Sequence, residues 1–217
     1  MEMVGMPRFL FAQYLNETDL ECISIVPQIP PLDGQIPMPY YPTGNDGDPT
    51  YPEHPDWAAV NENGWYNQAC LSLIRDLIKS TSINVDSDRI YYTGLSYGGK
   101  ACWEFLKSAP ELFAGALCCA GWPIGYAYSN PDPDLLDELA VEVAIYKDMP
   151  VWIFVGGADA MRYGSIAVYN EIISQGGTAY YTEYPGVDHV GSCTRTWSNS
   201  ISTHWLFQQS IIFRQEN

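Results

Sequence analysis

The stretch Arg89-Ile-Tyr-Tyr-Thr-Gly-Leu-Ser-Tyr-Gly-Gly99 decides the fold. Its first part, residues 89–93, is rich in β-branched and aromatic side chains and predicts a strand. Residues 100–107 repeat apolar side chains at four-residue spacing and predict a helix. The run between them, residues 94–98, has the pattern G-x-S-x-G, which in this context indicates a serine presented on a tight strand-to-helix turn.

The glycines around Ser96 have expected tasks. A side chain two residues to either side of the serine would collide with neighbouring backbone, so we expect Gly94 and Gly98 to remove that collision. We expect Gly99 to let the helix approach the strand closely. Ser96 would then stand at the carboxyl edge of a sheet, beside a helix N-terminus that stabilises negative charge. A simple glycine-rich turn is the alternative interpretation.

Strands and helices alternate along the rest of the chain, which favours an α/β fold with a mostly parallel sheet and helices on both faces. A strand is also predicted at 22–26, closed by Pro27, which cannot continue a ladder. The helix near 69–79 carries apolar stripes at Ala69/Leu73/Leu77 and Cys70/Ile74/Ile78. The remaining predictions are strands at 114–120, 151–155 and 178–184, and helices at 166–173 and 198–213.

The chain length of 217 residues suits one domain, residues 1–217. Residues 27–60 are rich in proline and predict a long irregular loop. Residues 122–149 interrupt the strand–helix alternation, and we interpret them as an excursion above the sheet, or else as a surface helix without a functional role.

Charge and composition exclude several classes of protein. The chain has 10 Lys+Arg against 26 Asp+Glu, a net charge of −16, so it lacks the cations that neutralise a nucleic-acid backbone. Hydrophobic residues make up 47% of the sequence, too many for a disordered acidic tail. No apolar run approaches the roughly 18 residues that span a bilayer.

The 6 cysteines form no CxxC pair and no Cys/His cluster at zinc-ligand spacing, so we expect no metal site. Cys118 and Cys119 are neighbours in an apolar run, should point to opposite faces of a strand, and are interpreted as core residues. The even count permits disulfides without requiring them. Residues 1–15 lack a signal pattern, so localisation is undecided, with secretion favoured if a longer precursor exists.

A serine nucleophile needs a base, and there are only 3 histidines. His54 lies in the proline-rich segment and His204 lies inside the last predicted helix. His189 lies in a glycine-containing loop directly after the strand at 178–184, and catalytic groups in such sheets follow the strands. His189 is therefore the predicted base.

The acid of a serine triad on this kind of sheet falls between serine and histidine in chain order. Asp159 follows the buried strand at 151–155 through Gly156-Gly157-Ala158 and could orient the imidazole. Asp188 is the rival carboxylate, but a side chain adjacent to His189 normally points away from it. The predicted triad is therefore Ser96, Asp159 and His189.

The stretches 89–99, 150–159 and 181–189 carry a family resemblance. From Asp88 to the C-terminus the chain resembles the α/β-hydrolase group of poly(hydroxybutyrate)-depolymerase-like and feruloyl-esterase-like carboxylesterases, often named predicted peptidases. The resemblance implies a three-layer sandwich and ester hydrolysis through an acyl-enzyme, with Ser96, Asp159 and His189 as the triad. It implies no metal and no organic cofactor.

The resemblance also implies an N-terminal part that this sequence does not display. The family begins with two or three strands and a His-Gly loop that supplies one oxyanion donor, whereas Gly5 is the only glycine before Cys22. The backbone N–H of Tyr97 is the first expected oxyanion donor, and the second has no visible source. We expect a fragment of a longer enzyme, a site completed by another subunit or another N–H, or a weak relative.

An abbreviated N-terminus would leave a sheet edge uncovered, which invites pairing with another chain. The expected consequence is a homodimer through that edge, or poor solubility.

Few features of the sequence point to a particular substrate. The aromatic residues Trp122 and Tyr126, near Tyr97 and Tyr128, could stack on a phenolic acyl group or a sugar ring, or could be ordinary core. The acidic surface favours a neutral, small-molecule or plant-polysaccharide ester. Two alternatives stay open: a serine peptidase or acyltransferase, and a non-catalytic binding domain with a hydrolase-like fold.

Overall fold

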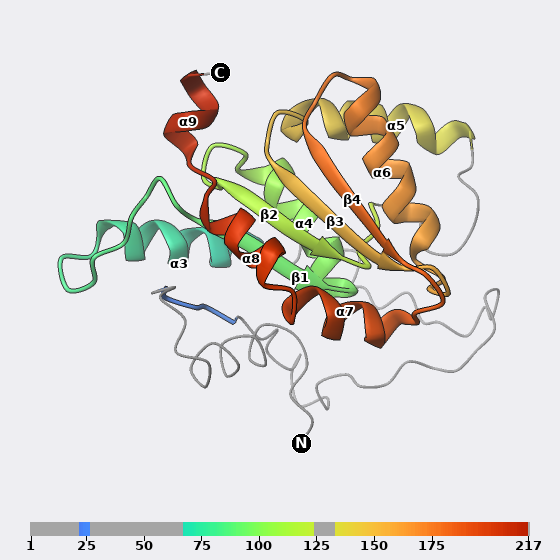
Figure 1. Ribbon diagram of the computed structural model, residues 1–217. Helices are drawn as coiled ribbons and strands as arrows, with labels where there is room; N and C mark the ends of the chain where they lie inside the picture. Colours follow the sequence, from blue (N-terminus) through green and yellow to red (C-terminus); the bar gives the residue numbers. More distant parts are fainter. Residues whose placement is uncertain (1–21, 27–66, 124–132, 217) are drawn as a thin grey trace, which may run out of the picture.

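The fold is built on a parallel sheet of four strands. The computed structural model describes residues 22–26, 67–123 and 133–216. The strands are β1 (Tyr91–Leu95), β2 (Gly115–Cys119), β3 (Val151–Gly156) and β4 (Ala179–Tyr184). They pair in chain order, β1-β2-β3-β4, and every pair is parallel. All four carboxyl ends therefore lie at one edge of the sheet (Figure 1).

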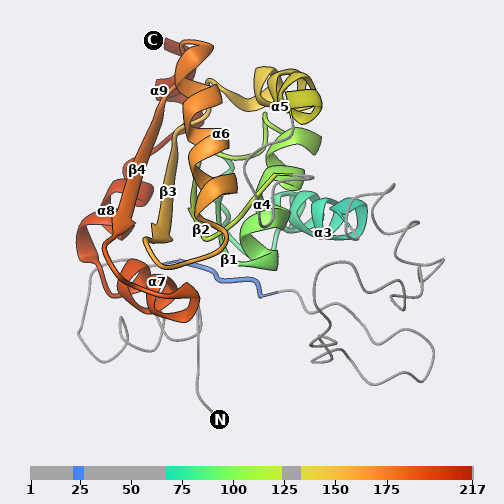
Figure 2. The same cartoon turned by 90° about the vertical axis from the view of Figure 1, so that its right-hand side faces the viewer.

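Helices cover both faces of this sheet (Figure 2). One face carries α4 (Tyr97–Ser108) and α6 (Arg162–Ser174), with α3 (Asn67–Lys79) packed outside α4 and α5 (Pro133–Tyr146) packed against α4 and α6. The other face carries α7 (His189–Trp197) and α8 (Ser200–Phe207), and the short α9 (Ile211–Glu216) follows. The described residues thus form three layers, as the sequence predicts.

The core lies on the two central strands. Every residue of β2 is buried, and so is every residue of β3 except Trp152, whereas β1 and β4 are mostly half-buried and lie at the two edges of the described sheet. The small side chains of β2 allow the helices on both faces to approach it closely. Helix α5, from the predicted excursion at 122–149, buries Leu139, Val143 and Tyr146 in the helical layer.

One prediction near the N-terminus is wrong, and a second is confirmed only in part. Residues 22–26 are exposed and form no strand, since no described strand pairs with them. The predicted helix is present as α3, and its residues Cys70 and Ile74 pack against the core, but Leu71 is its most buried position and Leu73 is 46% exposed. The apolar residues of this helix surround much of its circumference, so the spacing alone does not determine which face packs on α4.

The C-terminal helix is also different from its prediction. The expected single helix at 198–213 is broken into α8 and α9, and α7 precedes them. Asn199 starts α8 by accepting a hydrogen bond from the Ile201 N–H at 3.0 Å. The Ile211 N–H donates to the Asp88 carbonyl at 3.0 Å, a tertiary contact that separates α9 from α8. None of the helices in the described ranges has the length and apolarity that crossing a bilayer requires.

Candidate active site

Ser96 occupies the turn between β1 and α4. Its backbone has φ 58° and ψ −117°, in the region that disfavours residues with a side chain. Two hydrogen bonds hold this conformation: the Ser96 N–H donates to the Cys119 carbonyl at 3.0 Å, and the Lys100 N–H donates to the Ser96 carbonyl at 2.8 Å. The second bond starts α4. The turn therefore projects the serine side chain from the carboxyl edge of the sheet.

Two of the glycines in this turn have no room for a side chain, and a third has room for one. A Cβ on Gly94 would collide with the Gly98 backbone, and a Cβ on Gly99 would lie 2.7 Å from the Cys119 carbonyl oxygen and from the Gly121 Cα. These two positions confirm the expectation. The expectation for Gly98 is wrong, because a Cβ there would meet nothing within 4 Å. Gly98 contributes backbone to the turn without itself being crowded.

Asp159 and His189 meet at the same edge. Asp159 follows β3, His189 is the first residue of α7 after β4, and His189 Nδ1 lies 2.8 Å from Asp159 Oδ2. The other carboxylate oxygen of Asp159 accepts the Met161 N–H at 2.9 Å. The Asp159 side chain is 1% exposed and that of His189 is 36% exposed. An ionised carboxylate only accepts, so Nδ1 carries the hydrogen and Nε2 is left with its lone pair.

Asp188 has a different partner. It caps α7, its Oδ1 accepting the Gly191 N–H at 2.8 Å. The carboxylate nearest to His189 in sequence is therefore used for the helix, and the one from β3 contacts the imidazole. His189 lies on a helix rather than in the predicted loop, because the Asp188 cap begins α7 immediately before it.

The loops that carry Asp159 and His189 are joined by main-chain bonds. The Ala158 N–H donates to the Val187 carbonyl at 3.0 Å, and the Gly157 N–H donates to the Tyr184 carbonyl at 2.9 Å. A salt bridge adds to them, since Arg162 Nε lies 2.8 Å from Glu183 Oε2. These contacts fix the carboxylate and the imidazole relative to each other.

The structure brings Asp159 and His189 into contact and places Ser96 at the same edge of the sheet. In the described part of the chain no hydrogen bond joins the Ser96 hydroxyl to His189. In structures without substrate, such bonds are often long and shorten only when substrate binds.

The other predicted site residues lie as follows. Tyr97 is the first residue of α4, directly after Ser96. Trp122 is 7% exposed and packs edge-on against Tyr97, with ring centroids 5.5 Å apart. Tyr126 lies outside the described residues, and so does His54. His204, on α8, contacts the Ser200 carbonyl of its own helix through Nδ1 at 2.7 Å.

Sequence reasoning missed two contributors to this edge. Ala120 has φ 47° and directs the chain out of β2, and its N–H donates to the Phe154 carbonyl at 2.7 Å. Gly121 then packs against Gly99. The Ala-Gly pair at a strand end is the only sequence signal for this turn.

A disulfide lies behind the serine turn. Cys102 of α4 is bonded to Cys118 of β2, with their Cα atoms 6.4 Å apart. Both residues are fully buried. The interpretation of Cys118 as a core residue therefore holds for its burial but misses its partner.

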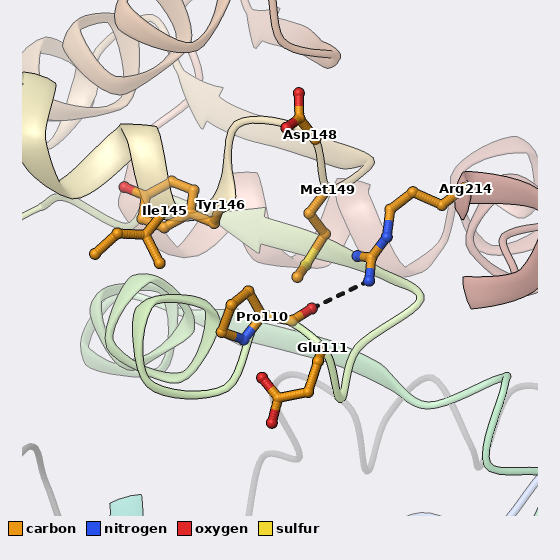
Figure 3. Close-up of a pocket in the computed structure, with 7 residues that line it drawn as sticks. All are labelled: Pro110, Glu111, Ile145, Tyr146, Asp148, Met149 and Arg214. Carbon is orange, nitrogen blue, oxygen red and sulfur yellow. Dashed lines mark hydrogen bonds between the residues drawn. The ribbon is translucent and has the colours of Figure 1, made fainter. Parts of the chain in front are cut away.

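The pocket in Figure 3 lies at the opposite edge of the sheet, where β2 and β3 begin. It has a volume of about 220 Å³ and is lined by residues 110–111, 145–146, 148–149 and Arg214. Arg214 donates to the Pro110 carbonyl at 3.2 Å and to the Phe113 carbonyl at 3.0 Å. Its guanidinium thus joins α9 to the loop before β2, at the edge of the sheet opposite to Ser96.

No cluster of three or more His, Cys, Asp or Glu side chains is placed to hold a metal ion in the described ranges.

No protein-family model matches the chain, and no curated protein matches it. Solved structures do match. A thermostable esterase is 32% identical over 66% of this chain and 36% of that chain, with a TM-score of 0.54. A Bacteroides ovatus protein assigned as a dipeptidyl aminopeptidase IV is 17% identical over 66% of this chain and 22% of that chain, with a TM-score of 0.52.

The fold and these neighbours agree. The chain has the α/β-hydrolase fold and is similar to a thermostable esterase over part of that protein's length. Its structural neighbours thus include an esterase and a protein assigned as a peptidase. The matched region spans about a third of the length of the thermostable esterase.

Proposed function

We propose that this protein is a serine hydrolase that cleaves carboxylic esters. The observation that carries the proposal is the combination of Ser96 in its strained turn with the hydrogen-bonded Asp159–His189 pair at the same sheet edge. A strained conformation persists only when the surroundings enforce it, and such positions cluster at functional sites. The likeness to a thermostable esterase supports the same reaction class.

In the proposed mechanism Ser96 Oγ attacks the ester carbonyl while His189 Nε2 takes its proton. Asp159 holds the imidazole in the required tautomer and stabilises the imidazolium. The Tyr97 N–H, at the first residue of α4, donates to the developing oxyanion. His189 then protonates the leaving alcohol, and water hydrolyses the acyl-enzyme by the same steps in reverse.

The substrate class is inferred from the net charge and from two aromatic residues beside Ser96. We propose a neutral ester, either a small molecule or one linked to a plant polysaccharide through a phenolic acid. The net charge of −16 disfavours anionic polymers. Trp122 is buried against Tyr97 and would act by supporting that ring, whereas Tyr97 is partly exposed and can contact an acyl group.

The test is covalent labelling with a fluorophosphonate probe followed by peptide mapping. We expect the label on Ser96, its absence from Ser96→Ala, and a strong loss of labelling in His189→Gln. p-Nitrophenyl acetate hydrolysis should follow the same order. Equal rates for the wild type and Ser96→Ala would instead favour a non-catalytic binding domain. Faster turnover of a peptide anilide than of the matching ester would favour a peptidase.

A further inference from the structure

Cys119 is a residue of β2 that contacts both halves of the proposed site. Its carbonyl accepts the Ser96 N–H at 3.0 Å and so helps to hold the serine turn. Its side chain points to the other face of the sheet, where Sγ lies 3.5 Å from Thr196 Oγ1 of α7. Both Cys119 and Thr196 are fully buried.

The direction of the sulfur–oxygen contact follows from the neighbouring bond. The Thr196 hydroxyl donates to the Ser192 carbonyl at 2.8 Å, so its single hydrogen is already used. The Cys119 S–H therefore donates to a lone pair of Thr196 Oγ1. Burial raises the pKa of the Cys119 thiol far above its ordinary value, which keeps the donor protonated.

Hydrogen bonds along one face of α7 connect Thr196 to the first turn of the helix, where His189 lies. Ser192 and Thr196 are four residues apart, and both are buried against the sheet. The Ser192 hydroxyl donates to the Asp188 carbonyl at 2.8 Å. Asp188 caps the first turn of α7, which begins with His189. A displacement of Thr196 relative to β2 would therefore move the whole helix that carries the imidazole.

We propose that Thr196 is a positioning residue, which through its contact with Cys119 sets the position of His189 relative to Ser96. This inference rests on the proposed hydrolase function. The hydrogen bond between Cys119 and Thr196 is weak, but Cys119 is the residue that contacts both the turn of Ser96 and the helix of His189. A shift of about 1 Å between a base and its nucleophile can lower a rate by two orders of magnitude.

The test compares Thr196→Val, which keeps the shape but loses the hydroxyl, with Thr196→Ser, which keeps the hydroxyl. With p-nitrophenyl acetate we expect Thr196→Val to lower kcat roughly tenfold with KM nearly unchanged, since only the alignment of reacting groups is affected. Thr196→Ser should stay within about threefold of the wild type. Thr194→Val on the same helix, where Thr194 Oγ1 donates to the Val190 carbonyl at 3.4 Å, is the matched control and should not change kcat.

A second variant tests the same contact in case Thr196→Val does not fold. Cys119→Ala removes the other partner of the contact, and the double variant should be no slower than the slower single variant, because one interaction is lost in each case. Equal kcat for Thr196→Val and Thr196→Ser, or fully additive losses in the double variant, would overturn the positioning role. Ser96-dependent labelling with normal kcat in Thr196→Val overturns only this inference. A wild type without Ser96-dependent labelling overturns both.

Discussion

Two neighbouring cysteines of β2 fasten the sheet to its two helical layers in different ways. Cys118 points to one face and is covalently bonded to Cys102 of α4, the helix that begins after Ser96. Cys119 points to the other face and contacts Thr196 of α7, the helix that begins with His189, by a hydrogen bond. The helix after Ser96, α4, is therefore covalently cross-linked to the sheet, whereas the helix that begins with His189, α7, is held by packing and hydrogen bonds.

We expect this difference to make the turn that carries Ser96 more rigid than the helix that begins with His189. The turn that carries Ser96 is held by the close contact of Gly99 with Gly121, and the disulfide joins the following helix α4 to β2, so this turn has little freedom. His189, the proposed base, lies at the start of a helix that is joined to the sheet by hydrogen bonds of the kind worth about 1 kcal/mol each. We expect the serine side to respond to changes in backbone packing and redox state, and the histidine side to respond to single hydroxyl groups.

The largest effect is expected at the glycine contact on the serine side. Gly99→Ala should lower the fluorophosphonate labelling rate about a hundredfold, because its Cβ has no room against Cys119 and Gly121 and the turn must shift. Gly98→Ala is the matched variant in the same helix. Its Cβ meets nothing within 4 Å, so labelling should be unchanged and helix propensity should slightly increase stability. Similar labelling rates for both variants would contradict the crowding at Gly99.

The disulfide should give a smaller effect on labelling and a clear effect on stability. The double variant Cys102→Ala, Cys118→Ala should lose about 3 kcal/mol of unfolding free energy, since the sequence separation closed by the bond is 16 residues. Urea unfolding with and without dithiothreitol measures this. The reductant should lower the stability of the wild type and leave the double variant unchanged. An equal response of both proteins would show that the bond contributes nothing.

The smallest effect is expected where α4 meets α5. Lys107 Nζ lies 3.0 Å from Glu104 and 3.3 Å from Glu142, and both carboxylates are nearly buried. Burial disfavours the ammonium, but the carboxylates of Glu142 and Glu104 outweigh it and raise the pKa of Lys107. Lys107→Met should therefore cost about 1–2 kcal/mol at neutral pH, between the values for exposed and for fully buried ion pairs, because it leaves two carboxylates facing each other beside a partly exposed position.

The cost of Lys107→Met should depend on pH. Burial raises the pKa of Glu142 above its usual value even with Lys107 present, and the loss of the lysine would raise it further. A raised carboxyl pKa means that the folded state gains stability as the pH falls towards that pKa. Urea unfolding at pH 7 and pH 5 should show the smaller loss at pH 5. Lys147→Met removes an exposed pair with Asp148 and should change stability little at either pH.

Much of the sheet could be predicted from the sequence because its strands carry strong local signals. The apolar runs at 114–120 and 151–155 become the buried strands β2 and β3. The serine turn was predictable for the same reason, since Gly94 and Gly99 are required by contacts between residues close in sequence or on an adjacent strand. The strand β1 extends two residues further than expected, to Leu95, which pairs with Cys119.

The errors have a common cause in contacts between distant residues. The helix α7 depends on the Asp188 cap, and the break between α8 and α9 depends on a bond from Ile211 to Asp88. The strand predicted at 22–26 has β-branched residues, but propensity without a pairing partner does not make a strand. The partner of Cys118 could not be identified from spacing, because six cysteines allow many pairings.

In the part of the sheet that the structure describes, the order of the strands in space equals their order in the chain, so each ladder there joins consecutive strands. A connection between two of them can therefore change in length without altering any register. The connection with the most residues runs from β2 to β3, and its described beginning lies beside the serine turn, where Trp122 packs on Tyr97. A change in the length of that connection would leave unchanged the ladders of the strands after which Ser96, Asp159 and His189 lie.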